Sequence, residues 1–256
     1  MVKQMKKMEG IRTDLAIEKR KNNQKLLYKS NDNSINIYEI YDSNSITHCI
    51  GFEDFIDEII LKDILKKELH FFIDTCVKLK HYHAFVIGLG NENNTADSIG
   101  PKVVNLIQVN SHLESLGVKL KGNKISALEP GVLGKTGIDT KKIIESVTKE
   151  IKPDFLLLID SYVSKDIDYL NKTIQITNEG IIPGSGLKIA NQEISSKTLG
   201  LPVIVIGIPT AIEVNFYSSK KGKKFPYLVS TKDIDAFILK ITKIISDGLN
   251  EVFYEC

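Results

Sequence analysis

The sequence has few cysteines, little net charge and no long apolar run. Its three cysteines lack the spacing of a metal site or of a disulfide framework, so we expect a reducing compartment. The formal net charge of +2 does not imply a nucleic-acid-binding surface. No apolar run approaches the ~20 residues that span a bilayer, and the charged N-terminus lacks the apolar centre of a signal peptide. These absences predict a cytoplasmic protein that binds neither membrane nor nucleic acid directly.

Several sequence motifs that would indicate a cofactor-binding or metal-binding site are incomplete. Gly88-Leu89-Gly90-Asn91 follows an apolar run, but Asn93 stands where the dinucleotide-binding fingerprint needs its third glycine. Glu129 stands where a phosphate-binding loop ending near Gly134 would need its first glycine. None of the five histidines has the helical spacing of a zinc site. The sequence therefore predicts no cofactor, and we interpret the two glycine-rich stretches as tight loops that line a substrate.

The apolar pattern predicts an α/β fold. With 256 residues, of which 42% are apolar and 26% charged, the composition is that of a soluble globular protein. From His83 onward, strand-like runs alternate with helical patterns, which is typical of a mostly parallel twisted sheet with helices on both faces, in three layers. The expected strands are 84–88, 124–128, 154–159, 173–177 and 202–208, and the expected helices are 98–116, 139–150 and 233–253.

The residues before His83 have a different pattern. Alternation around residues 35–40 suggests an edge strand, and helical spacing predicts one long amphipathic helix from about 53 to 80. We divide the chain into residues 1–14, a clippable N-terminus, residues 15–82, an extension with edge strands and the long helix, and residues 83–256, the α/β domain.

Two carboxylates stand near the ends of buried strands. Asp160 directly follows the apolar run 155–159, and Asp97 lies seven residues after Gly90. In parallel α/β sheets chemistry gathers beyond the carboxyl ends of the strands, so the two acids are expected to meet there. Two neighbouring carboxylates cannot both ionise easily, which makes one an acid and the other a base. Asp97 also suits the N-cap of the helix predicted after it.

Seven stretches of the chain, in order, resemble the germination protease of spore-forming bacteria. The most specific is Gly88-Leu89-Gly90-Asn91 followed by Thr95-Ala96-Asp97-Ser98-Ile99-Gly100-Pro101-Lys102. The others are Arg12-Thr13-Asp14-Leu15-Ala16-Ile17-Glu18, Lys67–Ile73, Pro130-Gly131-Val132-Leu133-Gly134, Lys152-Pro153-Asp154-Phe155 with Ile159-Asp160, Pro183-Gly184-Ser185-Gly186 and Gly207-Ile208-Pro209-Thr210.

The resemblance implies an endopeptidase of the spore core that degrades small acid-soluble spore proteins at germination. It implies a zymogen that cuts its own chain between Asp14 and Leu15, with Asp97 and Asp160 as catalytic acids, and a homotetramer. The implied fold is phosphorylase/hydrolase-like and similar to that of hydrogenase-maturation proteases. By the same likeness the substrate is lined by glycine-loop residues, namely Gly90, Asn91, Gly131, Gly134, Gly184 and Gly186.

The chain departs from the family pattern in two places, and two alternatives to the metal-free enzyme stay open. Ala96 stands where the family usually has proline, and only residues 211–230 join the Gly207–Thr210 stretch to the last helix, where the family usually has a long segment. A homologue without catalysis that only binds is one alternative. The other is a metal-assisted endopeptidase of the hydrogenase-maturation type, with one divalent ion between Asp97 and Asp160.

Overall fold

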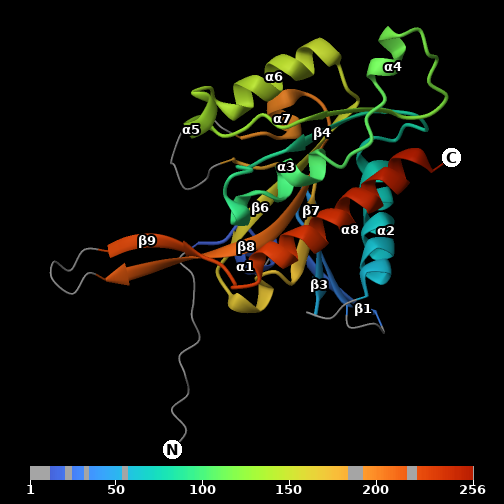
Figure 1. The fold of residues 1–256 in the computed structure, drawn as a ribbon. Helices are drawn as coiled ribbons and strands as arrows, with labels where there is room; N and C mark the ends of the chain where they lie inside the picture. The colour runs from blue at the N-terminus through green and yellow to red at the C-terminus, as the bar shows by residue number, and fades with distance from the viewer. Residues whose placement is uncertain are drawn as a thin grey trace, which may run out of the picture.

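The computed structural model describes residues 12–20, 25–31, 35–53, 57–183, 193–217 and 224–255. Within these ranges one nine-stranded sheet runs in the order β1-β2-β3-β7-β8-β6-β4-β5, with β9 paired to β8 (Figure 1). The strands are β1 (Lys25–Asn31), β2 (Ile35–Tyr41), β3 (Ile46–Phe52), β4 (His83–Gly88), β5 (Lys124–Leu128), β6 (Phe155–Ser164), β7 (Thr173–Thr177), β8 (Val203–Tyr217) and β9 (Lys224–Val229). The α-helices are α1 (Ala16–Lys19), α2 (Glu58–Cys76), α3 (Ile99–Val104), α4 (His112–Ser115), α5 (Leu133–Thr136), α6 (Thr140–Ile151), α7 (Ser196–Leu199) and α8 (Ile234–Tyr254), and the 3-10 helices are η1 (Thr95–Asp97) and η2 (Ile167–Tyr169).

The α/β class is confirmed, but the expectation of a mostly parallel sheet is not met, because the sheet is mixed. Only β5, β4, β6 and β8 pair in parallel. β7 runs antiparallel to both β3 and β8, and β1, β2 and β3 form an antiparallel meander. The connections explain this, because a parallel crossover needs a dozen or more residues. Three connections are too short for such a crossover, namely residues 32–34, 42–45 and 165–172. The two strands that each of them joins therefore run in opposite directions.

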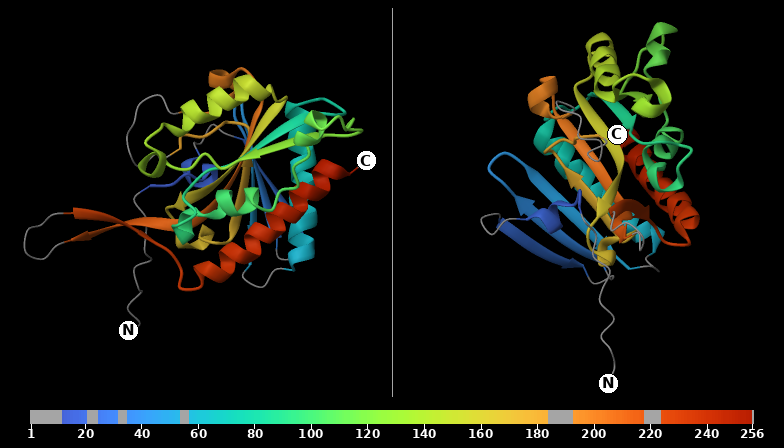
Figure 2. Two further views of the ribbon diagram at one scale, coloured as in Figure 1. Left: turned by 45° about the horizontal axis from the view of Figure 1, so that its top comes forward. Right: turned by 90° about the vertical axis from the view of Figure 1, so that its left-hand side faces the viewer.

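Alternate residues of the central strands face opposite sides of the sheet, and each side has its own apolar core. Ala84 and Val86 of β4 pack with residues of α2, α3 and α8 on one side. Phe85 and Ile87 pack on the other side with Ile144 of α6 and with the short α7 segment. Figure 2 shows the sheet between these two sets of helices. Both faces are apolar because both are covered, which explains why the central strands read as continuous apolar runs.

The long helix forms where the sequence predicts it, but it is shorter. It is α2, and it begins after Asp57, whose carboxylate accepts the N–H of Ile59 at 2.8 Å. It ends at Cys76, followed by Val77 and then by Lys78 with a left-handed φ of 58°. The predicted edge strand is also displaced, because β2 lies inside the sheet between β1 and β3.

The single helix expected over residues 98–116 is wrong. The chain forms α3 and α4, separated by residues that bind to β5. The side chain of Asn110 accepts the N–H of Ile125 at 2.7 Å and donates to the carbonyl oxygen of Asn123 at 2.9 Å. α3 already ends at Val104, and these bonds of Asn110 hold the residues between α3 and α4 against β5.

The described residues between 211 and 230 form two antiparallel strands of a hairpin. β8 continues to Tyr217 and pairs with β9, with Ile212 opposite Val229. The described parts of this hairpin project away from the helices (Figure 1).

Phe72 of α2 tests the packing of this helix, because its side chain is 0% exposed whereas the neighbouring Phe71 is 37% exposed. Phe72→Ala should lower the free energy of unfolding by about 3–5 kcal/mol. Phe71→Ala should cost about 1 kcal/mol, since the Phe71 ring is partly exposed and contacts only the edges of the core through His48 and Phe72. Urea denaturation measures both, and equal losses would contradict the described orientation of α2.

Candidate active site

Asp160 lies on β6 at the point where one of its neighbours stops. β4 ends at Gly88, which is paired with Ile159, so residues 160–164 continue beyond it. On the other side β6 still pairs with β8, where Asp160 is opposite Gly207. The carboxylate therefore stands at the carboxyl end of the parallel strands, which is the usual place for a functional group in this architecture.

Asp97 is carried to the same end by the loop that follows β4. Asn91 donates its N–H to the carbonyl oxygen of Asp97 at 2.9 Å. Gly90 has a φ of 115°, and a Cβ there would lie 2.1 Å from that oxygen, so only glycine allows the loop to close. η1 packs against β6 and β8, and the hydroxyl of Thr210 donates to the carbonyl oxygen of Ala96 at 2.5 Å. The N-cap position expected for Asp97 is held instead by Ser98, the residue before α3, whose side chain makes no capping bond.

Both acids have raised pKa values, and the charge of Asp97 contributes to that of Asp160. Burial raises the pKa of Asp97 to about 6, opposed by the hydrogen bond from the N–H of Asn91. Burial raises the pKa of Asp160 well above its ordinary range, and the charges of Asp97 and Asp14 raise it further. As whole residues, both are half-buried. On lowering the pH the first proton therefore goes to Asp160, and Asp97 stays ionised down to about pH 6.

The segment with the predicted cleavage site lies along the same strand. Asp14 donates its N–H to the carbonyl oxygen of Val163 at 2.8 Å, and its carboxylate accepts the N–H of Val163 at 2.9 Å. Leu15 is 0% exposed, in the apolar cluster that includes Tyr162. Ala16 donates its N–H to the side-chain oxygen of Gln175 at 2.6 Å. The bond between Asp14 and Leu15 is thus held next to the end of β6 that carries Asp160.

Tyr162 and Gln175 are site residues that the sequence interpretation missed. Tyr162 lies two residues after Asp160, on the same face of β6, and is 4% exposed. Its ring occupies the space beside Gly207, only 2.0 Å from where a Cβ would stand. Burial raises the pKa of Tyr162 well above its ordinary value, and the charge of Asp160 raises it further. The alternation of side chains along a strand was the one signal that could have pointed to Tyr162.

The other predicted lining residues are placed differently. Gly90 and Asn91 adjoin Asp97, as described above. Gly131 follows β5 and approaches Thr136, whereas a Cβ at Gly134 in α5 would meet nothing within 4 Å. The close neighbours of these two glycines therefore do not link them to the acids. Gly184 and Gly186 lie outside the described residues.

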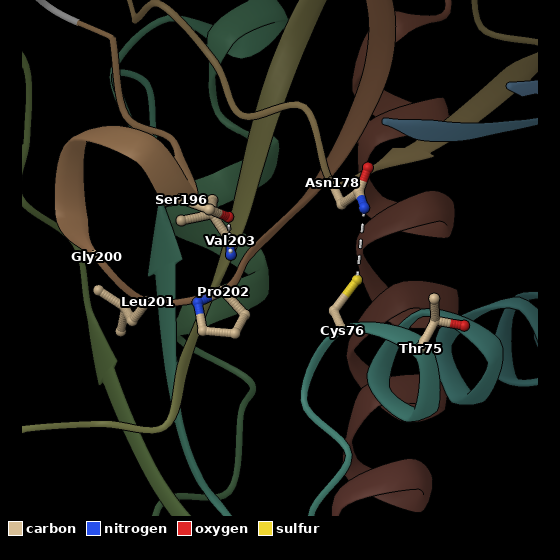
Figure 3. Close-up of a pocket in the computed structure, with 8 residues that line it drawn as sticks. All are labelled: Thr75, Cys76, Asn178, Ser196, Gly200, Leu201, Pro202 and Val203. Atoms are coloured by element: carbon tan, nitrogen blue, oxygen red, sulfur yellow. Dashed lines mark hydrogen bonds between the residues drawn. The ribbon is translucent and has the colours of Figure 1, made fainter. Parts of the chain in front are cut away.

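A pocket of about 420 Å³ lies at the opposite end of the parallel strands (Figure 3). Pro202 and Val203, at the start of β8, form one side, and Cys76 at the end of α2 forms another. The side-chain amide of Asn178 donates to the Cys76 sulfur at 3.7 Å. Because Asp160 lies at the carboxyl end of β6, this pocket is separate from the two acids.

The protein offers a divalent ion between the two acids few ligands of its own. Among the described residues, no group of three or more His, Cys, Asp or Glu side chains could hold a metal ion. A divalent ion between Asp97 and Asp160 would have the two carboxylates as its ligands among these side chains. Ca²⁺ takes six to eight oxygen ligands, and Mg²⁺ would draw most of its six ligands from water. In the same ranges, no helix is both long and apolar enough to span a bilayer.

Residues 40–221, which include both acids, match the germination protease family. This chain belongs to that family. It is 37% identical over 213 residues to the germination protease of Clostridium tetani and 36% identical over 236 residues to that of Caldanaerobacter subterraneus. It is 42% identical over 156 residues to that of Priestia megaterium. The family, as its name says, is one of proteases.

These matches are partial in length. They cover 65% of this chain and 65% of the Clostridium protein, and 75% and 73% for Caldanaerobacter. For Priestia megaterium they cover 60% of this chain and 42% of the relative. The chain therefore matches less than two thirds of the length of several relatives.

The raised pKa of Asp97 makes a prediction about stability. The folded protein holds this proton up to about pH 6, whereas an unfolded aspartate loses it near pH 3.8, so the ionised carboxylate destabilises the fold as pH rises through this window. Asp97→Asn should be more stable than the parent at pH 7, by about 2 kcal/mol after allowance for solvent exposure. The difference should vanish below about pH 4. Urea denaturation at both pH values measures it.

The matched control is Asp247→Asn, which changes an exposed acid on α8. A stability gain for Asp97→Asn that is the same at pH 4 and pH 7 would show that Asp97 does not titrate in this window.

Proposed function

We propose that this chain is an endopeptidase of spore germination, made as a zymogen that cuts itself between Asp14 and Leu15. One observation carries the proposal: Asp14 is hydrogen-bonded to β6 three residues beyond Asp160, with Leu15 buried beside it. Membership of the germination protease family supports a peptidase. The segment thus resembles a substrate added to the free edge of a strand, a common mode of peptide recognition.

The chemistry follows from the unequal pKa values. Ionised Asp97 takes a proton from a water molecule, whose oxygen attacks the carbonyl carbon of Asp14. Asp160, which keeps its proton to higher pH, donates it to the nitrogen of Leu15 as the peptide bond breaks. The products are a carboxylic acid at Asp14 and an amine at Leu15. Proton exchange with solvent then returns both acids to their starting states.

The contacts of the scissile bond favour this reaction. The carbonyl oxygen of Asp14, on which negative charge develops, accepts a hydrogen bond from the ammonium group of Lys19 at 3.3 Å. The leaving nitrogen of Leu15 donates to the hydroxyl of Thr13 at 3.0 Å. Gln175 and Val163 hold the backbone on either side of the bond, which limits its motion relative to the acids.

The substrates and the setting are proposed on the family resemblance. They are small acid-soluble spore proteins, cleaved in the cytoplasm of the spore core by a homotetramer after residues 1–14 have been released. Residues 15–82 then form the extension of the catalytic unit 83–256. The pairing of β3 with β7 supports a rigid attachment, because the extension shares the sheet.

Asp97→Asn and Asp160→Asn test the acid pair. Each should lower the rate of self-cleavage, and of cleavage of an added spore protein, by about 10²–10⁴-fold, because each removes a proton-transfer group. Mass spectrometry that detects a new N-terminus at Leu15 measures the first reaction, and gel analysis of the added protein measures the second. Asp247→Asn is the control that should leave both rates unchanged.

A chain that is folded but cleaves nothing, even before substitution, would favour the homologue that binds without catalysis. Full activity in either asparagine variant would contradict the acid pair.

Removal of metal separates the two versions of hydrolysis. The raised pKa values let the two acids move protons without a cation, so activity should survive prolonged treatment with EDTA. The rate of self-cleavage before and after chelation is the measurement. A loss that added Mg²⁺ or Mn²⁺ restores would establish the metal-assisted version.

A further inference from the structure

The carboxylate of Glu18 is bound by the turn that follows β6. One of its oxygens accepts the N–H of Asp166 at 2.6 Å, the N–H of Lys165 at 3.1 Å and the hydroxyl of Ser164 at 3.1 Å. The other oxygen accepts the Lys165 N–H at 3.0 Å and the hydroxyl of Thr13. Ser164 is 0% exposed, so it forms the floor of this site.

The turn suits a negatively charged group. Consecutive backbone N–H groups that converge on one point make a concave site for an anion, and bonds to a carboxylate are stronger than those to a neutral acceptor. The Ser164 hydroxyl has one proton, which it also directs to the carbonyl oxygen of Asp166 at 2.6 Å. The backbone N–H groups therefore contribute most of the binding of the Glu18 carboxylate. A glutamine would turn an NH₂ group, which only donates, toward donors.

The spacing along the chain connects this site to the cleaved bond. Glu18 lies four residues after Asp14, and the single turn of α1 returns its side chain to β6. Between them, Leu15 is buried and Ala16 is held by Gln175. With Glu18 bound to the turn, the peptide bond after Asp14 lies beside the end of β6.

We propose that the turn Ser164–Asp166 is a specificity site for an acidic side chain four residues after the cleaved bond, occupied in this chain by its own Glu18. This rests on the proposed endopeptidase function. Since Glu18 stays attached to the enzyme after the cut, it competes with any added substrate for the turn. The same side chain thus promotes the first cleavage, within the chain, and slows the later ones.

Binding tests the site without catalysis. The full chain carrying Asp160→Asn and Glu18→Gln is titrated calorimetrically with a peptide of residues 12–20, and with the same peptide carrying glutamine in place of the glutamate. The peptide with glutamate should bind at least about tenfold more tightly, as expected when charged hydrogen bonds are lost. Equal dissociation constants would overturn the site. Both dissociation constants are measured on the same protein, so a change in its stability affects them equally. If the double variant is unstable, the chain that carries only Asp160→Asn is titrated instead with an excess of each peptide.

Activity tests the competition. Glu18→Gln should slow self-cleavage by about tenfold, yet lower KM for the added glutamate peptide about tenfold at an unchanged kcat, because the chain's own segment no longer fills the turn. Glu150→Gln, an exposed acid on α6, is the matched control for both rates.

The outcomes separate this site from the enzyme itself. Tighter binding of the glutamate peptide with no cleavage by any variant would refute the proposed function and keep the site. Cleavage of both peptides with the same KM, together with normal self-cleavage of Glu18→Gln, would keep the enzyme and refute the site.

Discussion

The free edge of β6 is the feature on which the site depends. β4 ends opposite Ile159 while β6 continues to Ser164, so in the described part of the chain no strand pairs with the last residues of β6 on that side. Unpaired backbone N–H and C=O groups are a template for another chain segment. Residues 12–18 use this template, through the bonds of Asp14 with Val163 and of Glu18 with the following turn. A longer β4 would have closed the edge and covered Asp160.

Function here conflicts with stability. Three carboxylates, those of Asp14, Asp97 and Asp160, lie close enough that the charges of the first two raise the pKa of the third. Ionising them together costs free energy, and the burial of Asp97 and Asp160 adds to this cost. Gly90 allows the β4 loop to approach Asp97, and Gly207 leaves room for the Tyr162 ring. Strain and unfavourable charge at one end of a well-packed sheet are typical of sites where proton transfer occurs.

Much of the fold could be predicted from the pattern of apolar residues. The five strands expected after His83 and the helices α2, α6 and α8 appear near their predicted places because long periodic segments bury one face or both. The direction of β7 could not be predicted, since an apolar run has the same pattern in parallel and antiparallel pairs. The break between α3 and α4 was missed because Asn110 acts through a bond to β5, which is distant along the chain.

The same division applies to the site. The sequence by itself determined the family, the residue types and the position of Asp97 and Asp160 at the ends of apolar runs, because these depend on local pattern and order. Only the tertiary structure decided which groups surround them. Tyr162, Gln175 and the turn after β6 meet residues 14–18 across some 150 positions of chain. Their contacts arise from the strand order and from the end of β4, and neither is encoded in a local stretch. Desolvation by this packing, rather than the identity of the residues, sets the pKa order of the two acids.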